Sequence, residues 1–186
     1  MGTYLNPGNN SFKRIIRSDY VDKTGLISLI NERVDTEDSL ICVSRPRRFG
    51  KSYAARMLCA YYDCTCDSHE LFDKYTIAKS ESYEEHINKY HVLYLDITGF
   101  VSDEGIAGML KVLRDTLKEE AAEAFPDIAA KGRISDLLSA IADRTGRKFV
   151  AVIDEWDALI REAKDDKLIQ DTYLNLLRGL FKNNNF

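Results

Sequence analysis

Long apolar runs are missing from this sequence, and their absence limits where the protein can reside. Its apolar runs are about five residues long, whereas a helix that crosses a bilayer needs about 20. The N-terminal stretch is polar, contains the turn signal Pro7-Gly8 and lacks the apolar core of a signal peptide. We therefore expect a cytoplasmic protein without a membrane partner.

An excess of positive charge is also missing. Lys and Arg total 26 against 30 Asp and Glu, which gives a net charge of −4, so no overall basic field indicates nucleic-acid binding. Locally the charge differs, because Arg45, Arg47, Arg48 and Lys51 place four cations within seven residues. A solvated basic loop is one interpretation of this cluster, and a phosphate site is the other.

Cysteine is scarce as well: the chain has four, which do not indicate a disulfide framework in a protein of this class. Cys42 and Cys59 fall on apolar segments and are predicted core positions. Cys64 and Cys66 lie close to His69 in the chain and offer three zinc ligands, but a structural zinc site uses four. We interpret this segment as a loop of reduced thiols, with metal binding as the alternative.

What the sequence does contain is the composition of an ordinary globular protein. With 45% hydrophobic and 30% charged residues it is not a disordered tail, and 186 residues leave room for one domain with a real core. Apolar strand-like segments alternate with helical patterns, which predicts an α/β fold with a parallel sheet and helices on both faces. The predicted strands are 40–43 or 40–44, 92–97 and 149–153, and the main predicted helices are 51–63, 82–90, 102–125, 134–144 and 165–182.

Local signals set the boundaries of several elements. Residues 1–38 form an N-terminal segment, in which Thr24 is the expected N-cap of a helix. Ser82 and Glu85 have the spacing of a capping box. Gly146 is typical of a residue that ends a helix by adopting the left-handed backbone conformation. The last helix is expected to bury Leu168, Ile169, Tyr173, Leu176, Leu177 and Leu180.

The stretch Ser44–Ser52 carries the clearest chemistry in the chain. It ends in Gly-Lys-Ser between an apolar segment and a helical pattern, and a strand, tight loop and helix in that order hold a nucleoside triphosphate. Lys51 would reach the β- and γ-phosphates, and the Ser52 hydroxyl would ligate Mg²⁺. The residues expected to contact the nucleotide are Arg45, Pro46, Arg47, Arg48, Phe49, Gly50, Lys51, Ser52 and Tyr53.

This loop departs from the general pattern at one point. The pattern asks for Gly-x₄-Gly-Lys-Ser/Thr, and here Arg45 takes the place of the first glycine, followed by Pro46. The proline would stiffen the turn, and the arginines would add positive charge. Phe49 and Tyr53 are side chains on which a base could stack, but the residues alone do not indicate adenine.

Two acids follow the third predicted strand. Asp154 and Glu155 come directly after 149–153, and ligands of such sheets sit at the carboxyl ends of the strands. We expect Asp154 to hold Mg²⁺ through water and Glu155 to orient the water that attacks the γ-phosphate. Lys51 would then offset the charge that develops on the phosphoryl group.

Four stretches together resemble the predicted AAA-ATPase family, the AAA-ATPase-like proteins abundant in anaerobic bacteria. They are Tyr20-Val21-Asp22-Lys23-Thr24, Arg45-Pro46-Arg47-Arg48-Phe49-Gly50-Lys51-Ser52, Ile153-Asp154-Glu155-Trp156-Asp157 and Leu177-Arg178-Gly179-Leu180. The octapeptide is highly specific to that family, and the resemblance covers nearly the whole chain. It implies a P-loop ATPase core that takes ATP and whose Walker B strand ends in a catalytic Asp-Glu.

The resemblance also implies parts that this sequence does not show. Members of the family usually continue further, often into a carboxy-terminal nuclease-like domain of the PD-(D/E)XK kind, which would be the route to nucleic acid. A further strand with a polar sensor residue is implied between the phosphate-loop strand and the Walker B strand, and the chain stops at Phe186 before it. We therefore expect residues 39–186 to be a partial core, weakly stable or prone to form homo-oligomers.

Competing functions follow from these motifs. The leading hypothesis is a Mg²⁺-dependent ATPase, of which this chain alone binds nucleotide and turns it over poorly. The alternative is a non-enzymatic nucleotide switch that acts on a partner or an absent domain, and a small-molecule kinase is disfavoured because no acceptor site is evident. Arg47, Arg48 and Arg178 are candidates for γ-phosphate or inter-subunit contacts, and surface salt bridges explain them equally well.

Overall fold

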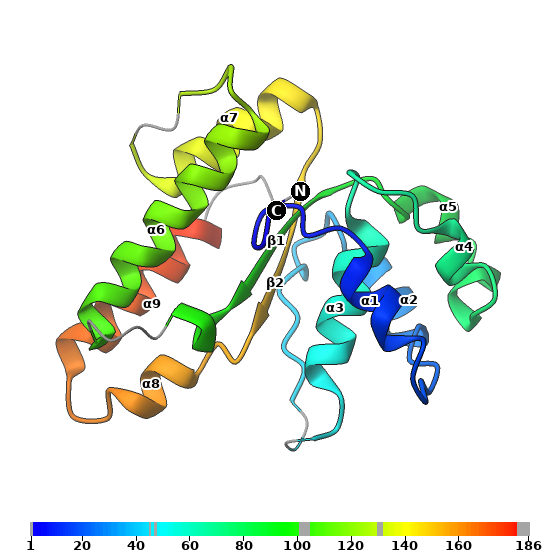
Figure 1. Ribbon diagram of the computed structural model, residues 1–186, viewed down its shortest axis with the longest axis horizontal. Coiled ribbons are helices and arrows are strands. Elements are labelled where there is room, and N and C mark those ends of the chain that lie inside the picture. Colours follow the sequence, from blue (N-terminus) through cyan, green and yellow to red (C-terminus); the bar gives the residue numbers. More distant parts are fainter. Residues whose placement is uncertain (1, 45, 47, 101–104, 130–131, 182–186) are drawn as a thin grey trace.

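The computed structural model describes residues 2–44, 46, 48–100, 105–129 and 132–181, which form a mostly helical α/β fold around two strands (Figure 1). The described elements in chain order are α1 (Asn10–Ile15), α2 (Gly25–Asn31), α3 (Lys51–Tyr62), α4 (His69–Phe72), the 3₁₀ helix η1 (Thr76–Lys79), α5 (Tyr83–His86), β1 (His91–Asp96), the 3₁₀ helix η2 (Ile97–Phe100), α6 (Gly105–Ala124), α7 (Ile134–Thr145), β2 (Phe149–Asp154), α8 (Ala158–Glu162) and α9 (Lys167–Phe181). The mixed α/β class predicted from the sequence is therefore confirmed, with a smaller sheet than expected.

The sheet consists of β1 and β2, which pair in parallel. The register runs from His91 opposite Phe149 to Asp96 opposite Asp154. Both strands lie where the sequence predicts them, to within a residue or two at each end. Their carboxyl ends meet at one edge of the sheet, and each of them ends in an aspartate.

The outer edge of β1 is covered by the N-terminal segment. The Asn6 N–H donates to the Val92 carbonyl at 2.8 Å, and the Tyr94 N–H donates to the Tyr4 carbonyl at 2.7 Å. Glu120 in α6 holds this segment in place, because its carboxylate accepts hydrogen bonds from consecutive backbone N–H groups there. Within the described part of the chain, β1 thus has a partner on each side, whereas only β1 pairs with β2.

The two faces of the sheet are covered by different helices. Side chains alternate across a strand, so Tyr94 and Val152 pack into a core formed with α3 and the N-terminal helices. Leu93 and Phe149 pack on the other side into a core formed with α6, α7, α8 and α9. Figure 1 shows these two helical layers with the strands between them. The expectation of helices on both faces is confirmed.

The strand predicted at Leu40–Ser44 is absent from the structure. These residues form no described strand or bridge, and Leu40, Ile41 and Val43 are 80%, 40% and 44% exposed. Cys42 is exposed rather than in the core, whereas Cys59 is buried as predicted. The physical reason is that a strand needs a hydrogen-bonded neighbour, and apolar composition alone provides none.

Two residues predicted to cap helices occupy the N-cap position but do not make the capping hydrogen bond. Thr24 precedes α2, but its hydroxyl makes no cap bond and instead donates to Asp22 at 2.7 Å. Ser82 precedes α5 without a capping bond, and its hydroxyl accepts from the side chain of Asn31 at 3.0 Å. The Thr24 hydroxyl also accepts the N–H of Ile77 at 3.2 Å, so both hydroxyls tie distant segments together, a use that local sequence cannot reveal.

The helices of the second half follow their sequence patterns closely. One face of α6 is buried, at Met109, Leu110, Leu113, Leu117 and Ala121, and α7 is terminated by Gly146 with a left-handed φ of 65°, as the sequence predicts. The first residues of the helix predicted at 102–125, up to 104, lie outside the described residues. In α9 Tyr173 and Leu180 are buried, but Leu168 is 78% exposed. The short helix α8 was not expected, and it follows the acids at the end of β2.

Candidate nucleotide-binding site

The Gly-Lys-Ser motif leads directly into α3. Gly50 is the N-cap residue with a left-handed φ of 75°, and its carbonyl accepts the N–H of Ala54 at 3.0 Å. Arg48 also has a positive φ, of 67°, so the chain turns sharply just before Lys51 opens the helix. A helix start presents unpaired N–H groups and the positive end of the helix dipole. This turn can therefore hold an anion.

The described loop residues are open to a ligand. Phe49 and Tyr53 are 60% and 52% exposed, Ser52 is exposed on the first turn of α3, and Lys51 is half-buried. Pro46 and Arg48 are exposed, and Arg45 and Arg47 lie outside the described residues. The residues predicted to contact the nucleotide thus remain accessible where the structure describes them.

The predicted acids lie at the end of β2. Asp154 is its last residue and only 7% exposed, and one of its oxygens, Oδ1, accepts the N–H of Glu155 at 3.1 Å. Glu155 leaves the strand with a φ of 51°, a conformation that costs a non-glycine residue energy and is common at functional sites. The acids therefore occupy a fixed turn at the carboxyl end of the sheet.

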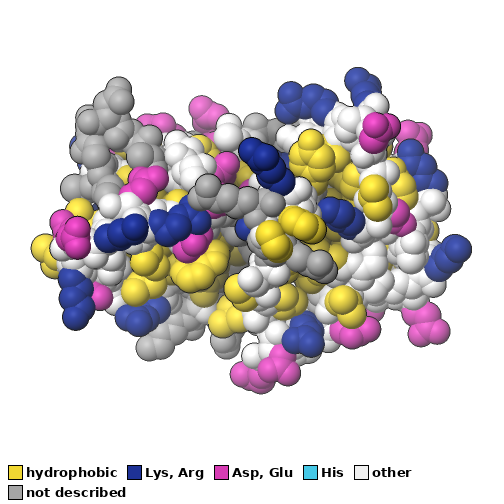
Figure 2. Space-filling model, turned by 90° about the horizontal axis from the view of Figure 1, so that it is seen from below, with side chains coloured by type: hydrophobic (Ala, Val, Ile, Leu, Met, Phe, Trp, Pro, Cys, Tyr) yellow, Lys and Arg dark blue, Asp and Glu magenta, His cyan; other side chains and the backbone are white. Residues whose placement is uncertain are grey.

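The loop and the acids share one end of the molecule. Helix α3 packs against both strands, and it begins at the end where both strands finish (Figure 1). Figure 2 looks onto this end, where hydrophobic and positively charged side chains lie together on the surface. Trp156 follows the acids in the chain and is 46% exposed. The motif that should hold phosphate and the strand end that carries the acids thus lie toward the same end of the molecule.

A further carboxylate, Asp96, lies in this region and was not predicted as a site residue. It is opposite Asp154 in the strand register, and its Oδ1 accepts from the N–H and hydroxyl of Thr98 at 3.1 Å and 2.6 Å. The signal in the sequence is the one that pointed to Asp154, an acid at the end of an apolar strand. Two parallel strands therefore bring two carboxylates to the same edge.

Arg56 is a second residue that the motifs did not indicate. Its guanidinium carbon lies 3.9 Å from the centre of the Tyr94 ring, between α3 and the sheet. Burial raises the pKa of Tyr94, Arg56 lowers it, and Asp154 and Asp96 raise it further. Arg56 therefore places a positive charge in the same neighbourhood as both strand-end carboxylates.

Glu155 is held by an arginine from the helix that follows it. Arg161 in α8 donates through Nη2 to Glu155 at 3.0 Å and through Nη1 to both carboxylate oxygens of Asp157 at 3.1 and 2.9 Å. The hydrogen bond to Glu155 raises the pKa of the guanidinium. Asp157 is thus an ion-pair partner of Arg161, and the carboxylate of Glu155 points toward α8.

Comparison with protein families decides which class of protein carries this arrangement. The sequence model of the family described as Predicted AAA-ATPase matches residues 7–185, nearly the whole chain. The chain belongs to the predicted AAA-ATPase family. Searches of curated proteins and of solved structures gave no significant match.

Membership in the AAA-ATPase-like family implies nucleotide binding. The match contains every stretch on which the sequence resemblance was based, from Tyr20–Thr24 to Leu177–Leu180. Among the described residues, no helix is long and apolar enough to cross a membrane.

The cysteine-rich loop of this AAA-ATPase-like chain uses its side chains for local contacts. His69 pairs with Asp67 at 2.7 Å and with Glu84 at 3.4 Å, and the hydrogen bond to Asp67 raises the pKa of the imidazole. Cys64 lies 3.4 Å from His91 Nδ1. Where the structure describes the chain, no three His, Cys, Asp or Glu side chains form a group that could hold a metal ion.

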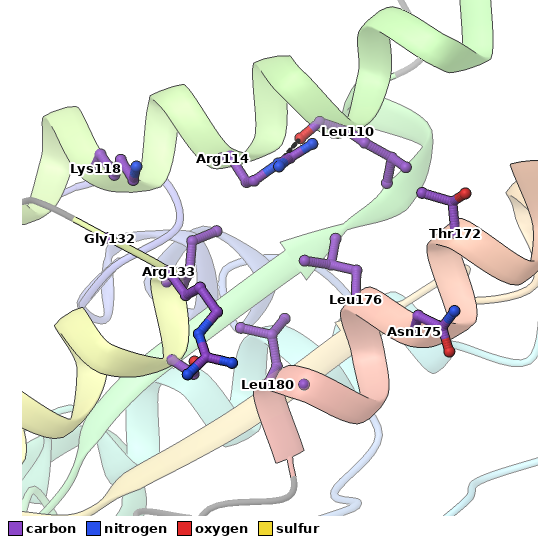
Figure 3. A pocket seen from close by; sticks show the side chains of 12 residues that line it. Leu110, Arg114, Lys118, Gly132, Arg133, Thr172, Asn175, Leu176 and Leu180 are labelled. Carbon is purple, nitrogen blue, oxygen red and sulfur yellow. Dashed lines mark hydrogen bonds between the residues drawn. The ribbon is translucent and has the colours of Figure 1, made fainter.

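A hollow between α6, α7 and α9 lies apart from the predicted site. It measures about 410 Å³, and Figure 3 shows leucines facing basic side chains across it. Its lining includes Leu110, Leu176, Leu180, Arg114, Lys118 and Arg133 but none of the residues predicted to bind nucleotide. Arg178 lies on α9, where its side chain is exposed and donates to Asn175 at 3.3 Å.

Proposed function

We propose that this chain binds ATP at residues 45–53 and belongs to a protein that hydrolyses ATP with Mg²⁺. The observation that carries the proposal is that α3, which Lys51 and Ser52 begin, packs on β2 and starts at the end of the molecule where β2 finishes with Asp154. Family membership supports the nucleotide, and the left-handed turn at Gly50 supports the anion site.

Each residue has a distinct role in this proposal. Lys51 binds the β- and γ-phosphates and offsets their charge. Glu155 accepts a hydrogen bond from the attacking water and orients it toward the γ-phosphate. The backbone N–H groups at the start of α3 hold the phosphate oxygens. Arg48 and Phe49 flank the site, and Tyr53 offers a ring to the base.

The donor set fits a magnesium ion bound together with the nucleotide. Mg²⁺ prefers oxygen ligands and takes only one or two carboxylates when phosphates and waters supply the rest. Ser52 offers an exposed hydroxyl and Asp154 a carboxylate, so these two residues would hold it. When bound, the ion would neutralise part of the phosphate charge.

The test is phosphate release from Mg-ATP by the wild-type chain, Lys51→Ala and Glu155→Gln. We expect the wild-type chain to hydrolyse ATP slowly, and we expect each of the two substitutions to lower that rate. If the rate is the same in all three proteins, the assignment of the residues is wrong.

We also propose that residues 39–186 form part of a larger ATPase sheet, preceded by the N-terminal segment 1–38. The exposed apolar side chains of Leu40 and Val43 support this, as does β2, whose one described strand partner is β1. A strand added beside β2 would satisfy its backbone groups and give Leu40–Ser44 a neighbour to pair with. A nuclease-like domain, the route to nucleic acid, would belong to such a longer protein.

Thermal unfolding of the chain checks this partial-core proposal. We expect a broad transition with a midpoint at or below about 45 °C, the lower end for mesophilic domains, because large apolar side chains remain exposed. Circular dichroism would follow the melt, and light scattering would report whether the chain forms homo-oligomers. A sharp transition above about 65 °C by a monomer would contradict the proposal.

A nucleotide switch is the second candidate, and the ion pair between Arg161 and Glu155 favours it. A glutamate held by a guanidinium is a weaker base for water, so hydrolysis would stay slow until a partner or an absent domain moved α8. Slow hydrolysis suits a switch, because the ATP-bound state then lasts long enough to be read.

Removing this ion pair distinguishes the switch from a plain enzyme. Arg161→Ala is expected to speed single-turnover hydrolysis about twofold to fivefold, the range for loss of a partly exposed ion pair, with ATP affinity unchanged. Arg144→Ala, in α7, serves as the control. Hydrolysis that stays the same or slows in Arg161→Ala would show that Arg161 does not restrain Glu155.

A further inference from the structure

The segment Tyr20–Thr24 lies against the phosphate loop, although 20 or more residues separate them in the chain. The ammonium group of Lys23 donates to the carbonyl oxygen of Phe49 at 3.0 Å. A Cβ atom at Gly50 would lie only 2.6 Å from the same Nζ. Lys23 thus occupies the space that glycine leaves open at the last residue before α3.

We propose that Lys23 is a positioning residue of the nucleotide site, which orients the peptide between Phe49 and Gly50 for phosphate binding. The inference rests on the ATP site proposed above and deepens it. Lys23 acts through the loop backbone, and neither the Gly-Lys-Ser motif nor the strand-end acids include it.

The peptide geometry explains how one hydrogen bond can orient the loop. In a trans peptide the C=O and the following N–H point in opposite directions. When Lys23 holds the Phe49 carbonyl, the Gly50 N–H points away from Lys23, and the Phe49 oxygen is kept from turning toward a bound anion. The bond involves a charged donor, so it is stronger than a neutral one.

Lys23 can act as a fixed point because its own segment is anchored on both sides. The Asp22 carboxylate accepts from the N–H and hydroxyl of Thr24 at 2.8 and 2.7 Å and from the N–H and hydroxyl of Thr76 at 3.0 and 2.7 Å. Burial raises the pKa of Asp22, but these hydrogen bonds outweigh it and lower the pKa below its usual value. Asp22 therefore remains a charged acceptor at neutral pH.

A second anchor ties the segment to α3 itself. The Tyr20 hydroxyl accepts the Lys23 N–H at 3.3 Å and donates to the Met57 sulfur at 3.2 Å. The Thr24 hydroxyl accepts the N–H of Ile77 at 3.2 Å. The backbone on either side of Lys23 is thus fixed to η1 and to the helix that the phosphate loop begins.

The proposal is tested with two variants of Lys23 in the full 186-residue chain. Lys23→Met keeps the aliphatic stem and loses the donor, and we expect its affinity for Mg-ATP to fall about fivefold to tenfold. The KM for ATP should rise by the same factor, whereas kcat should change by less than about twofold. Lys23→Arg retains a charged donor and should restore most of the affinity.

Two controls separate the possible failures. Lys79→Ala changes an exposed lysine at the end of η1 and should bind like the wild type, and the melting temperatures of the nucleotide-free variants should match. If Lys51→Ala loses ATP binding while Lys23→Met binds like the wild type, the inference about Lys23 is wrong. It is also wrong if Lys23→Arg binds as weakly as Lys23→Met. If Lys51→Ala also binds like the wild type, the proposed site itself is wrong.

Discussion

Lys51→Ala is expected to weaken ATP binding about 10-fold to 100-fold and to bring hydrolysis below detection. A charged hydrogen bond contributes about 1.5–3 kcal/mol, and each 1.4 kcal/mol is a factor of ten in affinity. Lys51 opens α3 directly after the left-handed Gly50, so the truncation removes the cation but leaves the turn in place. Calorimetric titration with Mg-ATP measures the affinity, and phosphate release measures the rate.

The matched control is Lys89→Ala. Lys89 is exposed, and its neighbour Tyr90 bonds to Tyr62 at the far end of α3. This variant should bind and hydrolyse ATP like the wild type. An equal loss of ATP affinity in both variants would indicate a general effect of charge. Unchanged affinity and rate in Lys51→Ala would show that Lys51 does not bind the phosphates.

Glu155→Gln is expected to separate binding from chemistry. Hydrolysis should fall about 100-fold to 10,000-fold, the range for loss of a general base, while ATP affinity should stay within about threefold. The glutamine keeps an oxygen that can accept from Arg161, which bonds to Glu155 at 3.0 Å, so α8 should keep its position. Single-turnover hydrolysis and equilibrium binding, measured on the same preparation, give the two quantities.

Glu162→Gln provides the comparison for this variant. Glu162 is exposed in α8, close in sequence to the proposed base, and its amide should leave the rate unchanged. A Glu155→Gln protein that hydrolyses ATP at the wild-type rate would assign the base to another residue, for which Asp96 would be the first candidate. If Glu155→Gln loses ATP affinity as well as hydrolysis, Glu155 has a structural role instead.

The elements that sequence reasoning predicted well are those whose pattern and partners agree. β2 and α7 each carry an apolar period and a clear boundary, and both lie where they were expected. Asp154 could be placed because an unbroken apolar run, 149–153, comes directly before it, so the end of the strand is clear in the sequence. Lys51 could be placed because its motif requires a helix start.

The segment Leu40–Ser44 shows where this reasoning stops. Its residues favour a strand as strongly as those of β2 do, yet they form none and are exposed. Strand formation depends on a hydrogen-bonded neighbour, and that neighbour is not a property of the segment. For the same reason the sequence does not reveal the hydrogen bond of the Thr24 hydroxyl, whose partner lies more than 50 residues away.

The contacts that refine the site are non-local and therefore invisible in the sequence. Lys23 meets Phe49 across the fold, and Arg56 meets Tyr94 across the interface of α3 and β1. The pair formed by Asp157 and Arg161 is the exception, because its i,i+4 spacing is typical of a helical ion pair. That spacing could have indicated α8, but not that Arg161 also holds Glu155.

The most direct test of the account is to find where ATP binds. A photoreactive azido-ATP can be cross-linked to the wild-type chain in the presence of Mg²⁺, and the labelled peptide can be identified by mass spectrometry. We predict that the label lies within residues 46–62 or beside Trp156 and that excess ATP suppresses it. A label on the hollow between α6, α7 and α9, at Arg114 or Arg133, would contradict the account.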